Sequence, residues 1–156
     1  YYHKSTGRPA DPAKSHTTRF IDIENDPAYP FGYGLSYTTF SVSAPRLEKA
    51  VLAPGEETRA LVTVTNTGQR AGEEVVQFYV RDRFASVTRP VKELRGFRKV
   101  MLAPGESRTL EFPVTKEQLG FYTNDGEFVV EPGDFDIMAG NSSDNLLRAT
   151  LTVTQQ

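Results

Sequence analysis

The sequence holds few residues that could act in catalysis. Its two histidines, His3 and His16, lie in a stretch without hydrophobic periodicity. A Ser-His-Asp triad needs its histidine in a rigid frame, and a zinc site needs several ligands close together. There is no cysteine, which excludes a thiol nucleophile. Nucleotide-binding motifs such as G-x-G-x-x-G do not occur either. We therefore expect this chain to carry no catalytic residue, no metal site and no cofactor.

Acidic residues are numerous but scattered. Glycoside hydrolysis usually needs two carboxylates that flank one bond, whereas most of the 20 Asp and Glu fall in predicted turns or at solvent-facing strand positions. Asp134 and Asp136 share one face of a predicted strand, with Asp125, Glu127 and Glu131 nearby. We interpret this group as an acidic surface, with a calcium site as the less favoured alternative.

Composition limits the class of protein. The 156 residues carry 18 Lys and Arg against 20 Asp and Glu, a net charge of −2, and 38% are hydrophobic, which is typical of a soluble globular protein. The near-neutral balance argues against a nucleic-acid partner. No apolar run approaches the roughly 20 residues that a membrane span needs. Because the chain does not begin with Met and shows no signal peptide, we expect a piece of a longer polypeptide; a mature protein after signal removal is the alternative.

Residues 1–37 differ from the rest of the chain. They contain several prolines, show no sustained period, and read as an extended, irregular tail or linker. Their aromatic content is too high for a solvated linker, so we expect another surface to cover these side chains. The expected interdomain docking residues are Tyr29, Phe31, Tyr33, Leu35 and Tyr37.

From residue 38 onward the hydrophobic period is two, which predicts β-strands. Pro-Gly turns, including two copies of Leu-Ala-Pro-Gly-Glu, separate the runs, and residues 115–119 have the pattern of a helical turn with a capping box. About seven short strands over 38–156 predict an all-β antiparallel sandwich. Without Cys and Trp, a fibronectin type III-like domain is favoured over an immunoglobulin domain. The main apolar runs are Phe40 and Val42; Ala60, Val62 and Val64; Val76, Phe78 and Val80; Leu110, Phe112 and Val114; Phe135, Ile137 and Ala139; and Leu147, Ala149, Leu151 and Val153, with weaker runs over 94–102 and 127–130.

The most charged segment covers residues 81–98. It could be a charge-laced loop between strands, or a docking loop, because arginine and aromatic side chains are enriched where proteins meet. The two interpretations are equally favoured. The expected docking residues in this loop are Arg83, Phe84, Arg89, Lys92 and Arg95.

Several motifs, in order along the whole chain, resemble the C-terminal part of glycoside hydrolase family 3 enzymes, and are most similar to bacterial periplasmic β-glucosidases. The strongest is YPFGYGLSYTTF at 29–40; the others are VQFYV at 76–80, SVTRPVKELRGF at 86–97, LAPGE at 102–106 and EPGDF at 131–135, with Tyr1-Tyr2 and Thr6-Gly7-Arg8-Pro9 upstream.

The resemblance implies a TIM-type barrel and an α/β sandwich domain as partners in the same enzyme, with both catalytic carboxylates on those domains. Residues 1–37 would pack on them, and the long loop would lie near the active-site entrance or a homodimer contact. The whole enzyme would be a retaining hydrolase of β-glucosides or oligosaccharides, periplasmic or secreted, and 38–156 its stabilising, non-catalytic domain. A free-standing carbohydrate-binding or extracellular spacer module is the alternative.

Overall fold

The structure is a computed structural model that describes residues 2–3, 11, 13–14 and 26–155. It confirms the all-β prediction, with seven strands of three or more residues and four of two residues. The elements are β1 (Phe40–Val42), β2 (Arg46–Leu47), β3 (Val51–Leu52), β4 (Thr58–Asn66), β5 (Gly72–Asp82), β6 (Glu93–Leu102), β7 (Ser107–Val114), α1 (Lys116–Leu119), β8 (Phe121–Tyr122), β9 (Phe128–Val129), β10 (Gly133–Gly140) and β11 (Leu146–Val153).

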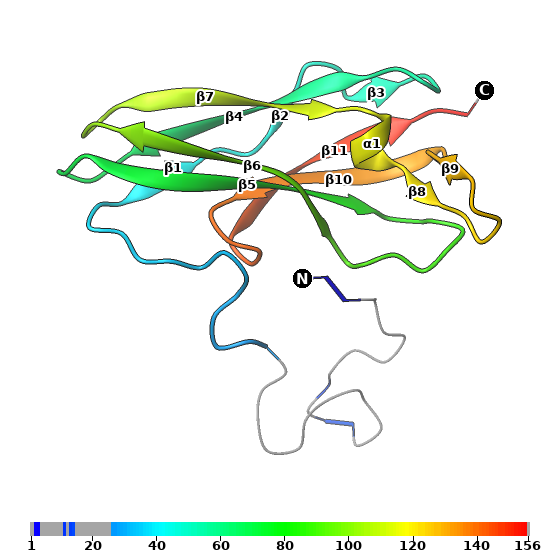
Figure 1. Cartoon of the computed structure of the whole chain (residues 1–156), viewed down its shortest axis with the longest axis horizontal. Helices are drawn as coiled ribbons and strands as arrows, with labels where there is room; N and C mark the ends of the chain where they lie inside the picture. Colours follow the sequence, from blue (N-terminus) through cyan, green and yellow to red (C-terminus); the bar gives the residue numbers. More distant parts are fainter. Residues whose placement is uncertain (1, 4–10, 12, 15–25, 156) are drawn as a thin grey trace.

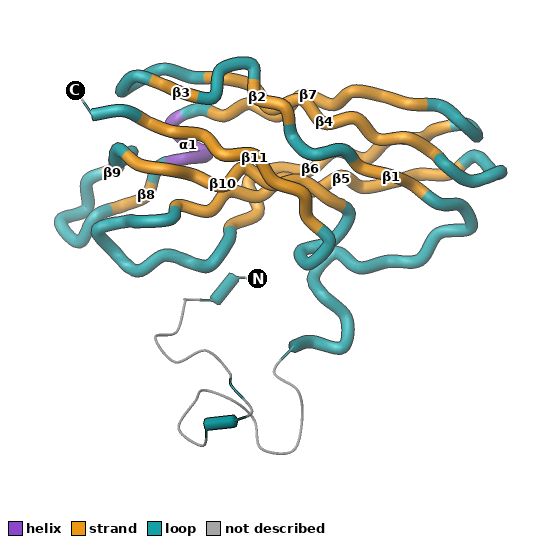
Figure 2. The backbone as a smooth tube through the Cα atoms, turned by 180° about the vertical axis from the view of Figure 1, so that it is seen from behind, coloured by secondary structure: helices purple, strands orange, loops and turns teal. Residues whose placement is uncertain are grey.

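Two sheets stack into a sandwich (Figure 1). In the four-stranded sheet, β7 pairs along one edge of β4 from Thr58 to Thr65, so β1 and β2 pair with its other edge. The five-stranded sheet has the order β3-β11-β10-β5-β6, and β8 pairs with β9 in a small ribbon. One pair departs from the antiparallel prediction, because β3 runs parallel to β11. The chain crosses from the first sheet to the second between β2 and β3, and β3 forms the edge of the second sheet next to β11 (Figure 2).

The core lies between the sheets, where the predicted alternation holds. Phe78 of β5 stacks on Phe112 of β7 with ring centroids 4.9 Å apart and planes 5° from parallel. Both side chains are almost fully buried, as are Val62 and Val64 of β4 and Ile137 of β10. Large apolar residues from both layers therefore close the interior, as the period of two predicts.

Strand β5 is buried on both faces. Its outward residues Gln77 and Tyr79 are 4% and 0% exposed. The alternation alone predicts partly solvated side chains at these positions. They are buried because residues 29–34 and the β10–β11 turn lie over the outer face of the five-stranded sheet (Figure 1).

Local sequence signals determine the ends of the elements. Thr115 caps α1 and Gln118 returns the interaction to its backbone, which is the predicted capping box. The two Pro-Gly turns are alike: Gly55 and Gly105 adopt positive φ, and Glu56 and Glu106 accept a hydrogen bond from the backbone three residues earlier. Hydrogen bonds from Lys49 and the Ala53 N–H lower the pKa of Glu56, and equivalent bonds from the Ala103 N–H and Arg108 lower that of Glu106.

Asn66 connects three segments at one end of the sandwich. Its amide nitrogen donates to the carbonyl oxygens of Arg70, at 2.7 Å, and Leu102, at 3.0 Å. Its side-chain oxygen accepts from the Thr38 hydroxyl at 2.9 Å and the Gly68 N–H at 3.0 Å. The residue is fully buried. It thus ties the start of the domain to the end of β6 in a site without solvent to replace these bonds.

We expect Asn66→Ala to lower the free energy of unfolding by about 2–3 kcal/mol, because it leaves buried carbonyl groups without donors. Urea denaturation of the chain measures this. Asn124→Ala, in an exposed turn, is the matched control and should change stability by less than about 0.5 kcal/mol. Equal values for the two variants would contradict the role of Asn66.

Candidate docking surface

The aromatic segment, residues 29–37, is held on the five-stranded sheet by backbone contacts. The Phe31 carbonyl accepts the Ser143 N–H at 2.8 Å, and the Gly32 carbonyl accepts the Gln77 side-chain amide at 3.4 Å. Gln77 is itself fixed, since it donates to the Asn141 carbonyl at 2.9 Å and accepts the Tyr79 hydroxyl at 2.6 Å. The backbone of the segment is therefore anchored while its side chains point elsewhere.

Gly32 makes this approach possible. Its φ is +79°, a conformation that side-chain-bearing residues rarely adopt. A Cβ built there would lie 2.0 Å from the Gln77 amide nitrogen. The glycine in the Pro-Phe-Gly-Tyr-Gly run thus serves a close backbone contact with β5.

The side chains of the aromatic segment are exposed. The five expected docking residues, Tyr29, Phe31, Tyr33, Leu35 and Tyr37, are between 51% and 93% accessible. Tyr29 and Tyr33 contact each other, with ring centroids 5.4 Å apart. Contiguous exposed apolar side chains on a soluble domain typically mark an interaction surface. His3 is exposed as well, whereas His16 lies outside the described residues.

The long loop spans residues 83–92, between β5 and β6, so Arg81 and Arg95 lie in strands. Arg83 turns back to the sheet and donates to Asp136 at 2.7 Å and to Asp134 at 3.5 Å. The acidic surface predicted there is thus partly neutralised by an arginine. The described residues contain no group of three His, Cys, Asp or Glu placed to bind a metal ion.

Arg89 is at the centre of a buried ion cluster. Its guanidinium lies 3.2 Å from Asp82 and 2.6 Å from Glu93, and its side chain is only 7% exposed. It also donates to the Leu119 carbonyl at 3.1 Å and stacks over the Phe121 ring at 5.0 Å. Burial raises the pKa of the Asp82 carboxyl, and the Phe84 N–H and the Arg89 charge oppose that rise. Arg89 therefore joins the loop to α1 and β8 of its own domain.

Lys92 and Arg95 are also engaged within the domain. Arg95 pairs with Glu93 at 2.7 Å and contacts carbonyl groups at the end of α1. Lys92 donates to the Ser143 carbonyl, and burial lowers the pKa of its ammonium group. Phe84, at 83% exposed, is the expected loop residue that projects to solvent. Among the five expected docking residues of this segment, the cationic side chains are thus held within the domain, and Phe84 is left exposed.

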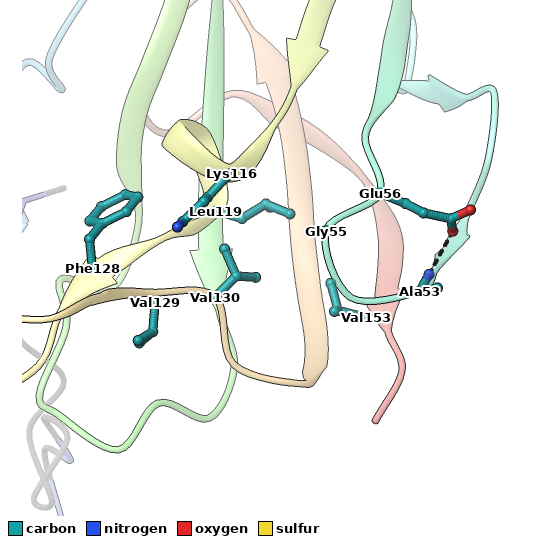
Figure 3. Close-up of a pocket in the computed structure, with 9 residues that line it drawn as sticks. All are labelled: Ala53, Gly55, Glu56, Lys116, Leu119, Phe128, Val129, Val130 and Val153. Carbon is teal, nitrogen blue, oxygen red and sulfur yellow. Dashed lines mark hydrogen bonds between the residues drawn. The ribbon is translucent and has the colours of Figure 1, made fainter. Parts of the chain in front are cut away.

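A separate apolar pocket lies at the opposite end of the sandwich from the aromatic segment (Figure 3). Its volume is about 330 Å³, and Leu119, Val130 and Val153 point into it between α1, the β9–β10 turn and the β3–β4 turn. Lys116 lies over the Phe128 ring at 5.6 Å. None of the expected site residues lines it.

The exposed side chains of the aromatic segment were predictable from the sequence, but the residues that hold its backbone were not. The roles of Gln77 and Ser143 depend on contacts with distant segments, and nothing in their local sequence distinguishes them. The arginine partners Asp82 and Glu93 stood within the charged segment, but their pairing depends on how the loop folds.

No helix in the described residues is long and apolar enough to cross a membrane.

Comparison with known proteins agrees with this architecture. Residues 74–143 match the family model described as fibronectin type III-like domain. The chain is 46% identical over 145 residues to a periplasmic β-glucosidase of Salmonella typhimurium, covering 92% of this chain and 19% of that protein. It is 47% identical over 137 residues to a β-xylosidase of Formosa agariphila, covering 86% and 19%. A crystal structure of a β-glucosidase from Listeria innocua, in complex with glucose, superposes with a TM-score of 0.92 at 40% identity, covering 99% and 22%.

The sandwich is therefore a fibronectin type III-like domain. The chain spans about a fifth of the length of the relatives and solved structure that it matches. The chain belongs to glycoside hydrolase family 3 and corresponds to the fibronectin type III-like part of these enzymes, as the motifs at 29–40 and 86–97 indicated.

We expect Gly32→Ala to release the aromatic segment from the sheet, because the added Cβ collides with Gln77 and positive φ is strained. Hydrogen exchange at the Ser143 amide, which donates to Phe31, should rise at least tenfold, a loss of about 1.4 kcal/mol. Gly34→Ala is the control, since nothing lies within 4 Å of its Cβ position. Unchanged protection in Gly32→Ala would show that this contact does not anchor the segment.

We expect Arg89→Met to destabilise the chain by about 3–5 kcal/mol, because it leaves the Asp82 carboxylate buried without its cation. Chemical denaturation measures the loss. The exposed Arg81→Met should be nearly neutral, and Phe84→Ala should also leave the stability of the chain unchanged. A large effect of Phe84→Ala would mean that its ring packs within the domain.

Proposed function

We propose that this chain is the non-catalytic, stabilising part of a family 3 β-glycosidase. The aromatic segment docks on the preceding TIM-type barrel and α/β sandwich domains of the same enzyme. The observation that carries this proposal is a folded backbone that presents five exposed apolar side chains in one segment. The relatives, about five times longer, provide the further chain that such a surface requires.

Burial of these side chains is large enough to hold domains together. An aromatic side chain buries about 150–250 Å² when covered, so covering half of one ring removes about 100 Å² from water. At about 25 cal/mol per Å², each ring contributes about 2.5 kcal/mol before the entropy of docking is subtracted. Because Gln77 and Ser143 already hold the backbone of the segment, docking does not also have to order that backbone.

The sequence shows no pair of carboxylates arranged to flank one glycosidic bond. We propose that the nucleophile and the acid/base belong to the preceding domains, and that the long loop extends toward the active-site entrance or a second copy of the enzyme, with Phe84 as its contact residue. Names of the relatives support hydrolysis of a β-glucoside or β-xyloside by the whole enzyme and a periplasmic or secreted location.

A decisive first experiment is native mass spectrometry of the protein purified from its source. A species much heavier than 17.4 kDa that contains this sequence and hydrolyses an aryl β-glucoside supports the proposal. A species of 17.4 kDa that binds cello-oligosaccharides supports a free-standing module instead.

In the longer enzyme, we expect the double variant Tyr33→Ala/Tyr37→Ala to lower Tm by about 2–3 °C. Two docked rings contribute about 5 kcal/mol, and about 1 kcal/mol shifts Tm by roughly 0.6 °C in a protein about five times as long as this chain. The isolated chain should lose much less, because both rings are exposed there. Differential scanning calorimetry of both forms measures the difference. Tyr122→Ala, an exposed ring in the β8–β9 ribbon, should affect the two forms equally. The same small effect for the double variant in both forms would contradict docking through this segment.

A further inference from the structure

A polar groove of about 360 Å³ runs beside the aromatic segment. It lies between the backbone of residues 32–36, the start of β5 and the turn between β10 and β11. Tyr33 and Leu35 line it, so the groove is continuous with the expected docking surface. Any domain that covers these two side chains also covers the groove.

Glu74 is the half-buried carboxylate of this groove. One of its oxygens accepts the Val75 N–H at 2.8 Å, and the Asn141 side chain provides a further hydrogen bond. Burial raises the pKa of this carboxyl, and the two hydrogen bonds oppose the rise. The Glu74 carboxylate therefore accepts two hydrogen bonds, but neither donor carries a positive charge.

No ion pair in the described part of the chain includes Glu74. The neighbouring Glu73 takes the local cation, because its carboxylate lies 2.5 Å from Lys99. Glu73 lines the groove as well, but its charge is paired with Lys99, and the polar side chains of Ser36, Asn141, Ser142 and Asn145 are neutral. The groove thus presents one uncompensated negative charge next to the apolar docking side chains.

We propose that this groove receives a lysine or arginine side chain from the preceding domains of the same enzyme, with the Glu74 carboxylate as its counter-ion. The inference rests on the proposed function, because it names the chemistry of the surface that docks. When that surface covers Tyr33 and Leu35, water leaves the groove, and a carboxylate in a low-dielectric site must be paired or protonated. Pairing also fixes the register of a docking contact that apolar side chains leave loosely specified.

The test compares Glu74→Gln in the longer enzyme and in the isolated chain by calorimetry. Glutamine keeps the shape and the acceptor oxygen but removes the charge. We expect Tm of the longer enzyme to fall by about 1 °C, and Tm of the isolated chain to stay constant or rise slightly. Glu111→Gln is the matched control: it removes an exposed pair with Arg59 on the four-stranded sheet, away from the groove, so its effect should be equal in both forms.

Three results would overturn the inference. An unchanged or higher Tm of the longer enzyme in Glu74→Gln would mean that the carboxyl is docked in its protonated form. An equal fall in both forms would place the counter-ion within this chain. Stabilisation of the isolated chain by cellobiose, lost in Glu74→Gln, would make the groove a sugar site. If Tyr33→Ala/Tyr37→Ala lowers Tm while Glu74→Gln does not, only this inference fails; if neither does, docking itself fails.

Discussion

The hydrogen bond between the Gly32 carbonyl and the Gln77 side-chain amide fixes the backbone from which the exposed aromatic side chains project. It fixes a stretch without regular secondary structure on the outer face of β5, and it helps bury Tyr79 on a face that a simple sandwich would leave in water. With the backbone held against the sheet, the aromatic side chains of residues 29–37 point toward solvent. The exposed surface is therefore a consequence of how its backbone is satisfied, rather than of disorder in a linker.

The aromatic segment and the long loop are parts of one connected structure. Ser143 donates its N–H to the Phe31 carbonyl and accepts the Lys92 ammonium on its own carbonyl, which links the two through a single residue. The long loop also contacts the start of the chain, because the Val91 N–H donates to the His3 carbonyl at 2.7 Å. Both features lie on the side of the five-stranded sheet (Figures 1 and 2). A partner that binds one of them is thereby placed against the other, and the buried cluster around Arg89 limits how far the loop can move.

The parts of this structure that follow local rules were predictable, and the parts that follow distant contacts were not. The period of two identified the strands of three or more residues, and the spacing of Thr115 and Gln118 identified α1. Two-residue strands such as β2 and β3 carry too little pattern to detect. The sequence left open whether the arginines of the charged segment belong to a charge-laced loop or face a partner. In the structure, Arg83, Arg89 and Arg95 pair with carboxylates of their own domain. A charged segment in a sequence does not reveal which charges cancel after folding, whereas an aromatic run in an irregular segment has few internal partners available.

The outer faces of the two sheets differ in polarity, and this difference favours the five-stranded sheet as the face that docks in the proposed function. On the four-stranded sheet, the outward positions carry hydroxyl ladders, such as Thr63 with Thr109 at 3.2 Å and Thr65 with Ser107 at 2.7 Å. Arg59 adds exposed pairs to Glu111 of β7 and to Glu48, which follows β2. These groups are satisfied in water and gain little from being covered, because exposed pairs lose hydration when buried. The five-stranded sheet instead carries exposed rings and an unpaired carboxylate, which gain from a partner that supplies apolar surface and a positive charge. In the proposed docking, the five-stranded sheet therefore faces the preceding domains, because the four-stranded sheet is already satisfied by solvent.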